Sequence, residues 1–327
     1  MPIQLFRLLL LFLLAGWQFA WAESAPDTAT PAITVPVQAK PDPAEILRQM
    51  QAAPPRGLFY KISKNGRTAY LFGTIHVGKA DFYPLDMATM QALVQSSELV
   101  VELDATQTDK MKAAIQHYAM LPAPQTLDAT LPPELGKRLQ TQFDILGVPR
   151  ETVQSWKPWM ATLALVMGAM QKSGFDPGYA TDIYLIMLGK GLNKPVTELE
   201  SIDYQLQLFD TLSHQEQLDF LSESLATLET GQQQGDTQVL IEAWLNNDAE
   251  KLHQLSLKSF RDNPRTARWM KQKLFTERNQ HMAEKIDRML TEGHTPFVAV
   301  GALHLTGKDG LPALLEKRGY RVTNLYP

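Results

Sequence analysis

Residues 69–76 read Ala-Tyr-Leu-Phe-Gly-Thr-Ile-His, and residues 297–304 read Phe-Val-Ala-Val-Gly-Ala-Leu-His. Each stretch is an apolar run that ends in Gly-x-x-His, and the two lie near opposite ends of the 327-residue chain. Short apolar runs bounded by glycine are typical of strands buried on both faces of a sheet. Because ligands bind beyond the carboxyl ends of strands in open α/β sheets, we predict that these strands lie close together and that His76 and His304 meet at one edge.

Further strands are predicted before, between and after these two stretches of the sequence. Residues 58–63 and 67–72 flank Asn65-Gly66, a strong hairpin signal because both turn positions tolerate positive φ. Further strands are predicted, at 99–103, 194–199 and 321–325. The pattern from about 106 to 293 is mostly helical, with breaks near Gly235 and Pro264. The predicted fold is therefore α/β, with a mixed sheet built from both ends of the chain and a large helical insertion.

The N-terminus has the pattern of an export signal. Arg7 precedes an apolar run at 8–14, and Ala20-Trp21-Ala22 then places small residues at the two positions that a signal peptidase reads. The apolar run is too short to cross a bilayer, which needs ~20 residues. We therefore predict a signal peptide at 1–22, a periplasmic or secreted product, and no stable membrane insertion after cleavage. Residues 23–55 are interpreted as a Pro/Ala-rich linker, with order beginning near Leu58 in a domain of residues 56–327.

The composition excludes several classes of function. The net charge is −4 and no long block of one sign occurs, so neither a nucleic-acid partner nor a polybasic membrane patch is expected. The chain has no cysteine, which excludes disulfides and a cysteine nucleophile. His-Glu-x-x-His, Gly-x-Ser-x-Gly and phosphate-loop motifs are absent as well.

Two histidines and two glutamates are the candidate functional residues at the sheet edge. A single histidine after a strand is usually a hydrogen-bonded core residue, but here the same arrangement occurs twice, at His76 and His304. Glu102 lies inside an apolar strand, where a charge is costly unless it is paired or bound to a metal. Both alternatives remain open. Glu200 follows the strand at 194–199, and a solvated side chain is the alternative to a functional one.

Arg278 and Asp182 lie on predicted helices and have less specific signals. Arg278 shares one helical face with an apolar stripe, namely Leu274, Met282, Ile286 and Leu290. An arginine there either extends to the edge of the stripe or pairs with an internal acid, and both interpretations remain open. Asp182 opens the helix at 183–188, where it would cap or flank the helix.

These residue types predict a hydrolytic metal site. Two histidines and a glutamate with an open position suit zinc, and manganese or cobalt would also fit, because ligand type alone does not select the ion. We assign the metal ligands as His76, Glu102 and His304. Glu102 or Glu200 would act as the general base, and Arg278 would orient a carboxylate or stabilise developing negative charge. No other cofactor is expected.

Seven short motifs occur in an order that resembles the TraB/GumN family. They are Leu71-Phe72-Gly73-Thr74-Ile75-His76, Val101-Glu102-Leu103-Asp104, Lys157-Pro158-Trp159, Asp182-Ile183-Tyr184-Leu185, Leu199-Glu200-Ser201, Glu277-Arg278-Asn279 and Val300-Gly301-Ala302-Leu303-His304-Leu305. They span nearly everything from 58 to 327. The family includes the TraB-type pheromone-shutdown proteins and is similar to the Tiki metalloproteases, whose site uses two Gly-x-x-His histidines and a glutamate.

The resemblance implies an α/β hydrolase-like fold and divalent-metal peptidase activity. By motif match, the family's residues carry over to His76, Glu102, Arg278 and His304. The leading hypothesis is a periplasmic, metalloprotease-like hydrolase of peptides, with the insertion at 106–293 covering the cleft and selecting the substrate. The first alternative is a non-catalytic envelope protein that binds or sequesters a peptide or small ligand. The second is a structural or assembly protein. The substrate, the ion and the oligomeric state are not specified by the sequence.

Overall fold

The structure is a computed structural model that describes residues 42–262 and 265–326. The predicted signal peptide at 1–22 and the first part of the predicted linker lie outside the described residues. None of the helices within the described ranges combines the length and the apolar character that a bilayer-crossing segment requires.

A six-stranded mixed sheet organises the chain, with strand order β4-β3-β5-β2-β1-β6. The strands are β1 Phe59–Lys64, β2 Arg67–Thr74, β3 Leu99–Val101, β4 Val196–Glu198, β5 Phe297–Gly301 and β6 Arg321–Asn324. The hairpin of β1 and β2 turns at Asn65 and Gly66, whose φ angles of 52° and 78° are the positive values that the Asn-Gly signal predicted. The predicted α/β class and mixed sheet are confirmed.

The two Gly-x-x-His strands are direct neighbours. β2 and β5 pair in parallel, with Leu71 opposite Val298 and Thr74 opposite Gly301. β5 also pairs in parallel with β3, and β3 with β4. The carboxyl ends of these four strands therefore lie at one edge of the sheet, although their sequences are up to about 230 residues apart.

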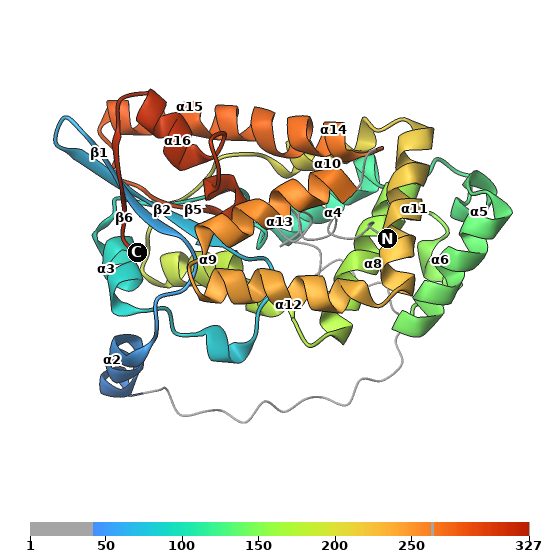
Figure 1. Cartoon of the computed structure of the whole chain (residues 1–327), viewed down its shortest axis with the longest axis horizontal. Coiled ribbons are helices and arrows are strands. Elements are labelled where there is room, and N and C mark those ends of the chain that lie inside the picture. The colour runs from blue at the N-terminus through green and yellow to red at the C-terminus, as the bar shows by residue number, and fades with distance from the viewer. Residues whose placement is uncertain (1–41, 263–264, 327) are drawn as a thin grey trace.

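Helices supply the rest of the fold and most of the insertion. They are α2 Pro43–Ala52, α3 Met87–Gln95, α4 Thr108–Tyr118, α5 Leu127–Thr130, α6 Pro133–Leu146, α7 Arg150–Val153, α8 Pro158–Lys172, α9 Thr181–Gly191, α10 Ile202–Asp210, α11 His214–Glu229, α12 Gln232–Leu245, α13 Ala249–Asp262, α14 Ala267–Trp269, α15 Glu277–Glu292 and α16 Leu311–Lys317. A π-helix, Met270–Thr276, leads into α15. In Figure 1, α5, α6, α8 and α11 form a lobe at the end away from the sheet, while α15 runs along its upper side. α9 packs against β3 and β5.

Two helices differ from the sequence prediction. α2 lies inside the predicted linker, before the expected start of order at Leu58, because Asp42 accepts a hydrogen bond from the N–H of Ala44 and Pro43 occupies the first helical position. The break predicted near Gly235 lies four residues earlier, at Gly231 with φ 68°, and α12 continues through Gly235 itself. The other predicted break, Pro264, lies outside the described residues.

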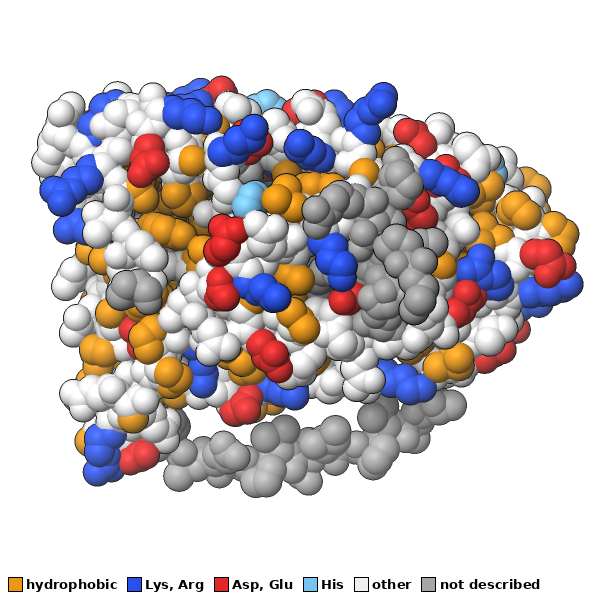
Figure 2. All heavy atoms as spheres, viewed as in Figure 1, with side chains coloured by type: hydrophobic (Ala, Val, Ile, Leu, Met, Phe, Trp, Pro, Cys, Tyr) orange, Lys and Arg blue, Asp and Glu red, His pale blue; other side chains and the backbone are white. Residues whose placement is uncertain are grey.

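Charged side chains of both signs are interspersed over the described part of the face in Figure 2. One exposed pair is Arg138 with Glu229, whose side chains are 35% and 36% exposed. Such pairs contribute at most about 1 kcal/mol each because water and salt screen them. The fold therefore depends on its buried apolar residues and on the buried polar groups described below.

Gly73 stands where β2 meets the insertion. Its N–H donates to the carbonyl of Leu58 and its own carbonyl accepts the indole N–H of Trp244 at 2.8 Å. A Cβ added at Gly73 would lie 3.0 Å from both Cα and Cβ of Ala302. The first glycine of the motif is thus required by close packing of β2 against the segment that carries His304.

We expect Gly73→Ala to lower the free energy of unfolding by about 1–3 kcal/mol, because the added methyl group overpacks this contact. The control is Gly235→Ala, in α12, where an added Cβ meets no atom within 4 Å. That substitution should be neutral or stabilise by up to about 1 kcal/mol, since alanine restricts the unfolded chain. Urea unfolding of both variants measures the contrast, and equal stabilities would contradict it.

Candidate functional site

The predicted site residues lie around the carboxyl edge of the sheet. Glu102 follows β3, Glu200 follows β4, and His76 follows β2. His304 lies in a short 3-10 helix, Ala302–Leu305, directly after β5. Arg278 comes from the first turn of α15. Arg278 and His304 are 0% exposed and the other three side chains belong to residues 5–6% exposed, so the site is buried rather than open at a rim.

Arg278 bridges the two glutamates. Its Nη2 donates to Glu102 Oε2 at 2.7 Å, while its Nε donates to Glu200 Oε1 and Oε2 at 3.0 and 2.9 Å. Gln205 also donates to Glu200 Oε2, at 3.0 Å. Of the two interpretations of Arg278, pairing with an internal acid is the one observed. The solvated alternative for Glu200 is wrong, because α10 and α15 cover it.

Glu102 also holds β5. Its Oε1 accepts the backbone N–H of Gly301 at 2.6 Å and lies 3.7 Å from His304 Nε2. Burial raises the pKa of Glu102, and the charge of Arg278 opposes that rise. Glu102 therefore connects the ends of β3 and β5 to α15, and the structural ion pair considered for it is present.

His304 has its two ring nitrogens in different surroundings. Nδ1 lies 2.5 Å from Asn279 Oδ1, and the ring stacks on Phe275 with centroids 5.2 Å apart. Nε2 faces Glu102 and has no hydrogen-bond partner among the described residues. Burial, followed by repulsion from Arg278 and from the neighbouring imidazole of His76, holds the pKa of His304 well below its ordinary value. Both causes favour the neutral form of the ring.

His76 is held by the start of α9. Its Nδ1 lies 2.9 Å from Asp182 Oδ1. The carbonyl of Ile75 accepts the N–H of Thr181 at 2.8 Å, which fixes the loop after β2 onto the same helix. Sequence reasoning gave Asp182 only a capping role and did not single out Asn279. Both stand inside quoted motifs, beside Ile183 and Arg278, but neither has a periodicity signal that marks it as a histidine partner.

The donor atoms of these residues are chemically suited to bind a cation. Each histidine has Nδ1 next to an oxygen acceptor, an arrangement common for metal-ligating imidazoles. Three buried carboxylates (Glu102, Glu200 and Asp182) and one guanidinium leave two excess negative charges when all are ionised. No three His, Asp or Glu side chains within 42–262 and 265–326 are grouped as a metal site in their present positions. The site thus has suitable donor residues, but no three of these side chains lie close enough together to coordinate one ion in the described structure.

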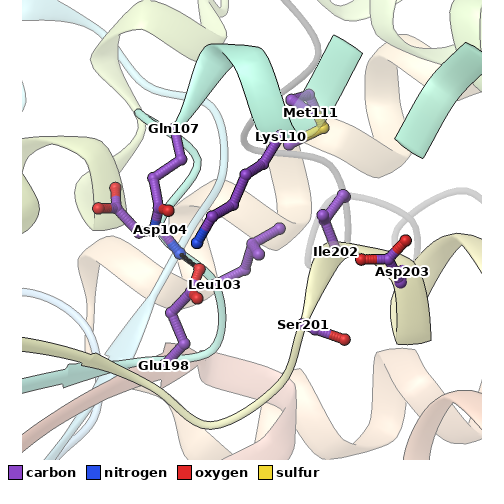
Figure 3. Close-up of a pocket in the computed structure, with 9 residues that line it drawn as sticks. All are labelled: Leu103, Asp104, Gln107, Lys110, Met111, Glu198, Ser201, Ile202 and Asp203. Carbon is purple, nitrogen blue, oxygen red and sulfur yellow. Dashed lines mark hydrogen bonds between the residues drawn. The ribbon is translucent and has the colours of Figure 1, made fainter. Parts of the chain in front are cut away.

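A pocket of about 180 Å³ opens beside the glutamates, between the end of β3, the end of β4, α4 and α10. It is lined by Leu103, Asp104, Gln107, Lys110, Met111, Glu198, Ser201, Ile202 and Asp203. Figure 3 shows the Lys110 ammonium directed toward the carboxylate of Glu198, whose Oε1 accepts the backbone N–H of Asp104 at 2.8 Å. The Asp104 carboxylate points away from Lys110 and pairs with Lys190. Leu103 and Ser201 directly follow Glu102 and Glu200 in the chain, so the pocket adjoins the backbone of the site.

Comparison with known proteins places the chain in a family. The TraB/PrgY/gumN family matches residues 58–324. The chain belongs to this family. Uncharacterized protein YbaP of Shigella flexneri and of Escherichia coli (strain K12) are each 28% identical over 251 residues, which is 76% of this chain and 88% of the relative. Metalloprotease TIKI1 of Danio rerio is 24% identical over 309 residues, covering 79% of this chain and 61% of the relative. No solved structure gives a significant match.

Proposed function

We propose that this TraB/PrgY/gumN protein is an exported, metal-dependent hydrolase that acts on peptides. The observation that carries the proposal is the buried Nε2 of His304, which faces Glu102 at 3.7 Å without a hydrogen-bond partner among the described residues. A buried nitrogen with a lone pair next to a carboxylate is a suitable place for a cation. The similarity to a protein named as a metalloprotease supports the reaction class. The pattern of residues 1–22 supports export.

His76, His304 and Glu102 would hold the metal. Such an ion lowers the pKa of bound water and polarises a carbonyl oxygen. Because the three side chains are not grouped as a site in their present positions, binding would require one of them to shift. Glu102 is the best candidate for this shift, because its Oε1 already lies 3.7 Å from His304 Nε2 and needs to move only a short way. Zinc, manganese and cobalt all suit these donors.

The two glutamates would have different roles. Glu200 is held by both Arg278 and Gln205, so we assign it to positioning the guanidinium. Arg278 in turn holds Glu102 and has no exposed surface for a substrate. Glu102, as the carboxylate nearest His304, would accept the proton from the attacking water as well as contact the ion. The pocket at Lys110 would receive one polar side chain of the peptide, since it is smaller than the ~300 Å³ of whole-ligand pockets.

A non-catalytic peptide-binding protein is the second candidate. It is favoured by the fact that both oxygens of Glu102 already accept hydrogen bonds, from Gly301 and Arg278. In that case the same residues would bind a ligand without turnover.

Hydrolysis of a fluorogenic peptide mixture separates the two candidates. We expect the metal-replete protein to cleave peptides, EDTA to abolish cleavage, and Zn²⁺, Mn²⁺ or Co²⁺ to restore it. Glu102→Gln should lose turnover, whereas Glu134→Gln, at an exposed glutamate in α6, should retain it. Peptide binding without cleavage under every metal condition would support the non-catalytic protein and contradict the hydrolase.

A further inference from the structure

Asn279 stands between His304 and the backbone of Asp309. Its Nδ2 lies 2.8 Å from the Asp309 carbonyl oxygen, and its Oδ1 lies 2.5 Å from His304 Nδ1. A carbonyl oxygen only accepts hydrogen bonds, so the amide NH₂ must face Asp309. The orientation of the Asn279 amide is therefore fixed by its surroundings and does not depend on how its oxygen and nitrogen were assigned.

The fixed amide determines which nitrogen of His304 carries the proton. Asn279 Oδ1 is an acceptor, and at 2.5 Å it requires a proton on Nδ1. In the Nε2–H tautomer, the lone pairs of His304 Nδ1 and Asn279 Oδ1 would face each other at that distance. The Nε2–H group could compensate only by donating to Glu102 Oε1, which lies 3.7 Å away and is too far for a normal hydrogen bond. The geometry thus favours the Nδ1–H tautomer.

We propose that Asn279 is a positioning residue that holds His304 in the Nδ1–H tautomer, so that the lone pair of Nε2 points toward Glu102. The role of Asn279 in metal binding rests on the proposed function. The assignment of the His304 tautomer is independent of that function. Phe275 limits rotation of the ring by stacking on it, so the amide sets the proton position and the aromatic ring sets the plane. Asp182 contacts Nδ1 of His76 in a similar way, but with a carboxylate.

The tautomer is measurable by ¹⁵N NMR on histidine-labelled, metal-free protein at about pH 8, above the ordinary histidine pKa of ~6.5. His304→Gln identifies the signals. We expect wild-type His304 to be protonated at Nδ1, Asn279→Asp to keep that tautomer, and Asn279→Ala to yield a mixture or the Nε2–H form. His294, whose Nδ1 contacts Glu98 at 2.5 Å, provides an internal reference that should not change.

The matched control is Asn246→Ala, which removes an exposed asparagine that also donates to a backbone carbonyl. It should leave the His304 signals unchanged. Wild-type His304 protonated at Nε2, or an unchanged Nδ1–H tautomer in a folded Asn279→Ala protein, would overturn the proposal. If Asn279→Ala does not fold, the tautomer of His304 in the wild-type and Asn279→Asp proteins still tests the proposal.

A second readout links the tautomer to the ion. Zn²⁺ titration of metal-free protein should show affinity about 10–100-fold weaker for Asn279→Ala than for wild type, as is typical when the partner of a ligating histidine is removed. Asn279→Asp should lie closer to wild type. Absence of Zn²⁺ binding in wild type, with the expected tautomer present, would contradict the proposed function and leave the role of Asn279 supported. Equal Zn²⁺ affinity in wild type and Asn279→Ala would contradict the positioning role.

Discussion

Arg278→Met is expected to lower the free energy of unfolding by about 3–5 kcal/mol, because it leaves the carboxylates of Glu102 and Glu200 buried without their countercharge. Methionine replaces most of the apolar part of the arginine side chain, so the loss of unfolding free energy measures mainly the effect of removing the positive charge. Arg138→Met is the control, since it removes an exposed ion pair with Glu229 and should cost at most about 1 kcal/mol. Urea unfolding at neutral pH measures both values.

The loss in Arg278→Met should depend on pH. Burial raises the pKa of Glu102 above its ordinary 4.5, and Arg278 opposes the rise, so removing Arg278 raises the pKa further. The folded variant then binds more protons than the unfolded chain, and its stability increases as pH falls through the raised pKa toward 4.5. The deficit relative to wild type should therefore be largest at neutral pH and smaller under mildly acidic conditions. A deficit that is small, or constant over this window, would contradict a buried charge triad.

His76→Gln and His304→Gln are each expected to remove divalent-metal binding and peptide hydrolysis to below detection. Glutamine retains polarity and much of the volume, which matters because both histidines are buried. The control is His117→Gln, at an exposed histidine in α4, which should retain both properties. Metal content after dialysis and the peptide assay are the two measurements.

The two properties must change together in these variants. If a histidine variant keeps a full complement of metal but loses hydrolysis, the assignment of that histidine as a ligand is wrong. If both variants keep both properties, the functional site lies elsewhere in the chain.

The sheet was predictable because its signals are local. An apolar run before Gly-x-x-His and an Asn-Gly turn require no knowledge of the rest of the chain, and the matching ends of the two runs predicted that β2 and β5 lie close together. The register was not predicted, because aligning the two motifs would place Gly73 opposite Gly301, whereas Gly73 pairs with Val300. The helix break predicted near Gly235 lies four residues earlier, at Gly231, where φ is positive. A glycine inside a helix costs only ~1 kcal/mol, so Gly235 does not by itself end α12.

The partners of the site residues were not predictable in the same way. The face that Arg278 shares with Ile286 indicated burial but could not identify the acids, which lie 78 and 176 residues away. Asp182 and Asn279 contact histidines across 106 and 25 residues, and hydrogen bonds of that kind leave no periodicity in the sequence. The depth of burial of His304 also depends on the insertion, whose path is set by tertiary packing.

Anomalous diffraction from crystals grown with Zn²⁺ directly tests whether His76, His304 and Glu102 hold the metal, because it locates the ion. We expect one ion within about 2.0–2.2 Å of a ring nitrogen of His76, of His304 Nε2 and of a Glu102 oxygen. An ion bound only elsewhere, or none at the ends of β2, β3 and β5 under metal-replete conditions, would contradict it.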